Sequence, residues 1–170
     1  MRRGLLHIVS IIALAGALPA AGNAQDKSRP ATAADFVGVF RLIDYPLEQQ
    51  PKVLKQPIWT SRCQFFGHYP DGYWLHQETH AGTCTSGVPS KKPGLPQTVQ
   101  WKFLSDGAVL IDRKDAKIRE LWKVDRVTRP THIDKINLID GDIIMQLLDV
   151  ERKHILWVRL LRRIGDASDD

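Results

Sequence analysis

Cysteine, methionine and the usual motifs of catalysis are scarce in this chain of 170 residues. It has two cysteines and two methionines. The cysteines do not form a C-x-x-C pair, and no serine lies in a Gly-x-Ser-x-Gly elbow. No internal repeat is evident, and beyond the N-terminal region no segment is apolar enough to span a bilayer. These absences argue against repeat folds and helical membrane proteins, and they leave no marked nucleophile.

The N-terminal region has the pattern of a secretory signal peptide. Two arginines near the start precede an almost wholly apolar run over 5–17, and small residues end at Ala24. We expect 1–24 to be removed and 25–34, which is polar and contains proline, to be a flexible leader. The apolar run is shorter than the roughly 20 residues of a membrane helix. No cysteine lies near the predicted cleavage point, which argues against a lipoprotein anchor. The protein is therefore expected in the periplasm or outside the cell.

The remaining charge is nearly balanced. The chain has 24 Lys and Arg against 19 Asp and Glu, and loss of Arg2 and Arg3 with the signal peptide would leave a formal charge of +3. So small an excess gives little support for a nucleic-acid partner, whereas an envelope protein or an anionic envelope surface is available to an exported protein. The body, 35–165, has the length of one domain. We expect a disordered acidic tail over 166–170.

Short apolar runs alternate with turn residues along the body. This pattern predicts antiparallel strands joined by hairpins. The expected runs are 36–44, 63–69, 73–79, 98–104, 108–112, 117–124, 132–139, 142–149 and 154–164. Within 112–124 a helix is the alternative, because Ile118, Leu121 and Trp122 also fit helical spacing. The predicted fold is all-β, an antiparallel up-and-down meander of about eight or nine strands that closes into a small barrel.

Two stretches resemble the lipocalin-like (calycin) barrels. Residues 35–42, DFVGVFRL, resemble the Gly-x-Trp opening of that family, with Phe40 where Trp is usual. Residues 157–163, WVRLLRR, look like its last strand, whose arginine covers that aromatic ring. The resemblance implies a lipocalin-like up-and-down barrel with an internal ligand cavity. The residues that would close the barrel are Gly38, Phe40, Arg159 and Arg162.

The stretch SRCQFFGHYPDGYWLHQETHAGTC, residues 61–84, predicts a hairpin. Pro70-Asp71-Gly72 fits a three-residue loop, which places Tyr69 opposite Tyr73. Alternation then gives one face with Cys63, Phe65, Tyr69, Tyr73 and Leu75. The opposite face carries Gln64, Phe66, His68, Trp74, His76 and Glu78. We expect the first face, which is more apolar, to point inward and the second to face solvent.

Cys63 and Cys84 leave a choice between a disulfide and a metal site. Two cysteines in an exported chain usually pair, and a chain reversal at 81–83 would bring Cys84 back to Cys63, so we predict a disulfide. A metal site with a nearby histidine has suitable ligand types. However, His76 and His80 lie about 13 Å apart on an extended strand, which is too far for one ion. We therefore expect no metal and no cofactor.

Three functions follow from these features. The first is a non-enzymatic exported barrel that binds a small apolar molecule or an envelope component. Its candidate ligand-binding residues are Phe66, His68, Trp74, His76, Trp101 and Trp122. The alternative is a protein-interaction module, such as an inhibitor or an accessory subunit, because two long loops with prolines, 45–60 and 81–97, suit partner contacts. The third is a small enzyme, which would need a histidine within hydrogen-bond distance of Glu78.

Overall fold

The computed structural model describes residues 27–46, 49, 63–79, 84, 97–105, 107–149, 151 and 154–167. The predicted signal peptide, most of the two proline-containing loops and the last three residues lie outside this part. The elements are β1 (Ser28–Pro30), α1 (Ala33–Phe36), β2 (Gly38–Leu42), β3 (Cys63–His68), β4 (Trp74–Thr79), β5 (Val99–Phe103), β6 (Ala108–Arg113), β7 (Ile118–Val127), β8 (Thr131–Ile133), β9 (Ile136–Leu138), β10 (Ile143–Leu148) and β11 (Ile155–Gly165).

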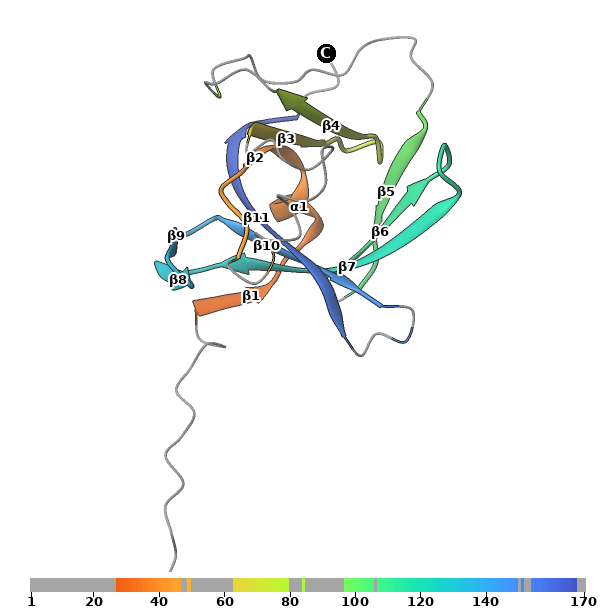
Figure 1. Cartoon of the computed structure of the whole chain (residues 1–170). Helices are drawn as coiled ribbons and strands as arrows, with labels where there is room; N and C mark the ends of the chain where they lie inside the picture. Colours follow the sequence, from red (N-terminus) through yellow and green to blue (C-terminus); the bar gives the residue numbers. More distant parts are fainter. Residues whose placement is uncertain are drawn as a thin grey trace, which may run out of the picture.

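Eight of these strands form an antiparallel ring. Their order in the sheet is β4-β3-β2-β11-β10-β7-β6-β5. The last of the eight strands along the chain, β11, pairs with the first of them, β2. Figure 1 shows the curved strands arranged around α1. In the part that the structure describes, β4 and β5 meet at one isolated bridge, between Tyr73 and Gln100. The prediction of an all-β, up-and-down meander is confirmed, and the barrel is nearly closed.

The ordered fold begins earlier than the sequence indicated. β1 pairs with β7, with Ser28 opposite Val127. α1 starts after Thr32, whose side chain and that of Asp35 cap each other's backbone N–H groups. The flexible leader predicted over 25–34 is therefore wrong from Ser28 onward, because strand pairing and the helix cap fix this polar stretch. The first predicted strand, 36–44, is likewise shorter, since Phe36 ends α1.

The structure tests two further parts of the predicted strand pattern, 132–139 and 112–124. The single strand expected over 132–139 is wrong: Asp134, in the left-handed region with φ of 53°, turns the chain between β8 and β9, which pair as a hairpin. This hairpin packs its apolar side chains on the outside of the barrel, against Val127, Ile144 and Leu160. The strand prediction for 112–124 is confirmed from Ile118, where β7 begins.

The predicted β3–β4 hairpin has the expected register. His68 lies opposite Trp74 and Phe66 opposite His76, and Gly72 takes the positive φ, 84°, that the three-residue loop requires. The assignment of its two faces is wrong. The face with Gln64, Phe66 and His68 points into the barrel and is buried.

The opposite face of this hairpin is covered from outside. Tyr69 and Tyr73 pack with Val39 and with Ala167 near the C-terminus. The disordered tail predicted over 166–170 is therefore wrong at Ala167, which is buried. Outside the barrel, Tyr69 and Tyr73 of the more apolar face are therefore buried in a small apolar cluster to which Ala167 contributes.

Aromatic side chains fill much of the barrel interior. The central cluster joins α1 to the strands around it through Phe36, Phe40, Phe66, Trp101 and Trp122. Each such side chain buries a large apolar area, so this cluster is a main source of the stability of the barrel.

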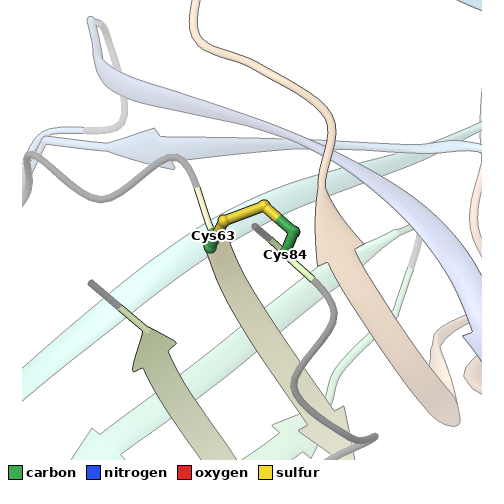
Figure 2. The surroundings of a disulfide bond; sticks show 2 residues. All are labelled: Cys63 and Cys84. Carbon is green, nitrogen blue, oxygen red and sulfur yellow. A yellow bond between two sulfur atoms is a disulfide. The ribbon is translucent and has the colours of Figure 1, made fainter. Parts of the chain in front are cut away.

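The predicted disulfide between Cys63 and Cys84 is confirmed. Their Cα atoms are 5.2 Å apart, and Figure 2 shows Cys84 beside the start of β3. Structural disulfides are typical of proteins that leave the reducing cytosol. No helix within the described ranges has both the length and the apolar character needed to cross a membrane.

Replacing Phe40 with alanine should lower the free energy of unfolding by roughly 3–5 kcal/mol, because Phe40 is fully buried in the central cluster. Urea denaturation followed by tryptophan fluorescence measures this. Arg41→Ala is the matched control: Arg41 is exposed on the same strand, and its loss should change stability by less than about 1 kcal/mol. A Phe40→Ala loss as small as the control would contradict this role.

Removing the disulfide should also destabilise the fold. The bridge closes a loop between residues 21 apart in sequence, which corresponds to roughly 3 kcal/mol on the chain-entropy account. The double variant Cys63→Ala, Cys84→Ala should show this loss in urea denaturation, and reductant should have no further effect on it. Equal stability of the variant and the oxidised protein would show that the bridge is energetically neutral.

Candidate functional site

Polar side chains line the interior of the barrel at the end where β3 starts, which we call the Cys63 end. They come from β3, β4, β6, β7 and β11, and each lies in phase with the inward-facing aromatic or aliphatic residues of its own strand. We call this set the polar layer; its members are Gln64, His76, Glu78, Arg113, Glu120 and Arg159. Buried polar groups in a barrel interior cost stability unless they are hydrogen-bonded.

Gln64 connects the β3–β4 side of the polar layer. Its amide Nε2 donates to the Tyr45 hydroxyl at 2.7 Å, and its Oε1 lies 3.2 Å from His76 Nε2. His76 Nε2 also lies 3.3 Å from Glu78 Oε1. Because both neighbours are acceptors, the proton of neutral His76 is on Nε2. The side chain amide, the imidazole and the carboxylate thus form one hydrogen-bonded group.

Arg159 lies at the centre of the interior and is 2% exposed. Its guanidinium carbon is 4.6 Å from the ring centroid of Trp122 and 5.1 Å from that of Phe66, within the range of cation–π attraction. Burial lowers the pKa of Arg159, and the nearby charge of Glu120 partly offsets this. An arginine stays charged even so, so a fixed positive charge lies between two aromatic rings.

Glu120 brings a carboxylate to the β6–β7 side of the layer. It accepts a hydrogen bond from Trp122 Nε1 at 2.9 Å, and Arg113 approaches its other oxygen at 3.9 Å. Both side chains are partly buried. The sequence analysis missed this pair. The available signal was alternation: Glu120 is in phase with Trp122, and Arg113 with Ile111.

His76 is uncharged at neutral pH. Burial, together with the positive charges of Arg159 and Arg113, lowers its pKa to about 3. Its ring stacks on Phe66, with centroids 4.8 Å apart. His76 therefore acts in this layer as a neutral hydrogen-bonding group.

His68 belongs to the opposite end of the interior, beside α1, which we call the α1 end. Its ring stacks on Phe36 at 3.8 Å, and Nδ1 donates to the Phe36 carbonyl at 3.1 Å. Burial lowers the pKa of His68 to about 3. Its Nε2 is buried and has no hydrogen-bond partner among the described residues. His68 and His76 thus share a face, as predicted, but they occupy different layers and contact different rings.

The predicted ligand-binding residues all lie on the inward face of the barrel. Four of them, Phe66, Trp74, Trp101 and Trp122, are buried aromatic residues of one cluster. Trp101 is further fixed by its Nε1–H, which donates to the Tyr73 carbonyl at 3.0 Å. The solvent-facing position expected for His68 and His76 is wrong, because their face of the hairpin is the interior one.

The four predicted barrel-closing residues have different positions. Phe40 is buried in the central cluster, whereas Arg159 lies inside the barrel against Phe66 and Trp122 rather than across its end. Arg162 points outward and pairs with Asp142 at 2.7 Å. Gly38 lies against Arg163, whose Nε is 3.0 Å from where a Cβ on Gly38 would be. The arginine that packs on the Gly38 end is thus Arg163, one residue later than predicted.

The geometric condition for acid–base chemistry is met by His76 and Glu78, not by His68. A histidine with a pKa near 3 is a weak base at neutral pH, so its chemistry at that pH is limited to hydrogen bonding. Among the described residues, no three His, Cys, Asp or Glu side chains are grouped to hold a metal ion. Gln64, His76 and Glu78 are thus placed to hydrogen-bond to a polar group.

The fold and the site together define a small, disulfide-bonded up-and-down β-barrel with a polar layer in its interior. No family model, no curated protein and no solved structure matches the chain. The resemblance to lipocalin-like barrels stays a prediction.

Acid should destabilise the protein through His68, which is buried, and His76, which is partly buried. Their folded-state pKa values, about 3, lie below the ordinary 6.5, so the unfolded chain binds more protons between these limits. Stability should therefore fall as pH drops from about 6.5 toward 3. The double variant His68→Phe, His76→Gln should show a shallower fall, measured by urea denaturation between about pH 7 and 4.5.

The pH range of this test avoids the contribution of Asp35 to the pH dependence of stability. Burial raises the pKa of Asp35, but hydrogen bonds from Arg29 and Thr32 outweigh it and bring the pKa to about 2, so Asp35 matters only below about pH 4. His132→Gln is the control, since His132 is exposed. An unchanged slope in the double variant would show that neither histidine is responsible.

Proposed function

We propose that the protein is an exported, non-enzymatic binding barrel whose interior takes a small amphipathic molecule at the Cys63 end. The observation that carries this proposal is the inward position of the polar layer, with Arg159 buried between two aromatic rings. Export is supported by the predicted signal peptide and by the disulfide.

The polar layer changes the expected ligand from apolar to amphipathic. A wholly apolar molecule would cover His76 and Glu78, which are partly exposed, without offering either a hydrogen bond, at a cost to affinity. A molecule with a polar end can bond to these groups, while its apolar body packs against Phe66 and Trp122. Mostly apolar walls with a few convergent polar groups are typical of small-molecule sites.

A titration with two probes of equal chain length tests the proposal. Dodecanoate carries an anionic head and dodecanol a neutral one; tryptophan fluorescence of the mature protein reports binding, and native mass spectrometry reports a retained molecule. We expect saturable binding of at least one probe. Arg159→Met should weaken binding of dodecanoate about tenfold or more, because a charge-assisted hydrogen bond is lost.

The design separates binding from folding. A buried Arg→Met change is often tolerated, and circular dichroism checks that the variant is folded. Arg41→Met, on the outer face of β2, is the control that should bind as the unchanged protein does. If neither probe binds and purified protein has the mass of the chain alone, the binding barrel is wrong.

The alternative, a protein-interaction module, has one observation in its favour. Ile118, Ile155 and Leu156 are among the exposed large apolar residues, each at least half exposed, and all three come from strand ends at the Cys63 end. Exposed apolar side chains gathered at one end of a domain can form a protein contact surface. The outcome in which no probe binds would favour this function.

A further inference from the structure

A hollow lies outside the polar layer, beside α1 and the turn between β9 and β10. It has a volume of about 480 Å³ and is lined by Asp35, Arg126, Ile139, Asp140, Gly141, Asp142, Arg162 and Arg163. The volume is in the range of small-ligand sites. Three arginines from two strands line this one hollow, so the carboxylates that pair with them decide its charge.

Two aspartates of the hollow, Asp142, which is buried, and Asp35, which is partly buried, hold arginines firmly. Asp142, 2% exposed, accepts from Arg162 Nε at 2.9 Å and from its terminal nitrogen at 2.7 Å. Asp35, 11% exposed, is held in the same two-bond manner by Arg29, at 2.8 and 3.1 Å. Such bidentate pairs are strong and geometrically fixed. These contacts belong to the permanent structure of the fold.

Two other aspartates are exposed and hold their arginines weakly. Asp140, 62% exposed, makes one contact of 3.2 Å with Arg126, and Asp166, 91% exposed, makes one of 2.8 Å with Arg163. Exposed single contacts of this kind contribute little to stability. An anion with better geometry can therefore displace both carboxylates from the arginines at small cost.

The guanidinium groups of the hollow are held in place by the fold. Arg163 packs closely against Gly38, where a Cβ would lie 3.0 Å from Arg163 Nε. Arg126 is directed by Asp35, 3.4 Å away. The three arginines that line the hollow and the adjacent Arg29 are paired with four aspartates. An anion that displaced Asp140 and Asp166 would meet four arginines and the two remaining carboxylates, Asp35 and Asp142, a local excess of two positive charges.

We propose that this hollow is a binding site for a doubly charged oxyanion, the group that a phosphate monoester carries. Arg126 and Arg163 contact the anion directly, in place of Asp140 and Asp166, and Arg162 adds positive charge from the side. The site lies at the α1 end, away from the polar layer, so it is independent of the function proposed above.

Isothermal titration of the mature protein with inorganic phosphate tests the inference, at constant ionic strength and with sulfate as a competitor. Saturable binding is expected. Arg126→Gln and Arg163→Gln should each weaken it about tenfold, because each removes charge-assisted hydrogen bonds. Arg41→Gln, on an exposed arginine outside the hollow, should leave it unchanged. No saturable heat with the unchanged protein, or an equal loss with Arg41→Gln, would overturn the proposal.

A second pair of variants should act in the opposite direction. Asp140→Asn and Asp166→Asn remove the competing carboxylates, so each should tighten phosphate binding several-fold. Both side chains are exposed, so these variants should fold. Asp115→Asn, in the exposed turn before β7, is the control for the general change in charge. Equal tightening by all three would show that no specific site exists.

The source of the phosphate group is decided by two further probes. Phenyl phosphate represents a small soluble monoester, and phosphatidylcholine vesicles that contain phosphatidic acid represent a lipid headgroup. Binding of either, lost in Arg126→Gln, supports the site and assigns its source. Binding of neither would limit the hollow to an ion pair network of the fold and overturn the inference.

Discussion

The pairing of β11 with β2 is the constraint on which the rest of this structure depends. It brings the last strand of the meander back to the first, with Leu161 opposite Leu42 and Arg163 opposite Phe40. Once the ring is formed, alternation along each strand decides which side chains are inside. The same pairing places Arg159 in the interior and Arg163 against Gly38 at the α1 end. Both candidate sites therefore result from one closure.

The two ends of the interior differ in chemistry because different elements cover them. At the α1 end, Phe36 enters the barrel and stacks on His68, so that end is packed with aromatic rings. At the Cys63 end, no described helix enters, and Gln64, His76 and Glu120 face inward. Polar groups that face a barrel interior cost stability unless they are hydrogen-bonded, and titratable groups with shifted pKa values are frequent in functional sites. This asymmetry is the physical basis for placing ligand binding at the Cys63 end.

Arginine has three distinct roles in the molecule, and environment separates them. Arg159 is buried against two aromatic rings and contributes positive charge to the interior. Arg162 and Arg29 hold buried carboxylates and so belong to the fold. Arg126 and Arg163 contact exposed aspartates across a hollow. These arginines are thus distributed among cation–π contacts, structural pairs and a concave surface where positive charge is weakly compensated.

The sequence by itself determined the strand pattern, the β3–β4 register and the disulfide, because these depend on local alternation, turn residues and cysteine pairing. Only the tertiary structure decided which face is inside. Tyr69 and Tyr73 belong to the face of the hairpin that is more apolar in sequence, yet they pack outside the barrel against Ala167. Gln64 and His76, on the more polar face, point inward. Alternation shows that two faces differ but not which one the ring encloses, since that depends on distant segments. For the same reason, no local pattern brought Arg126, Arg163 and Asp35 to one hollow.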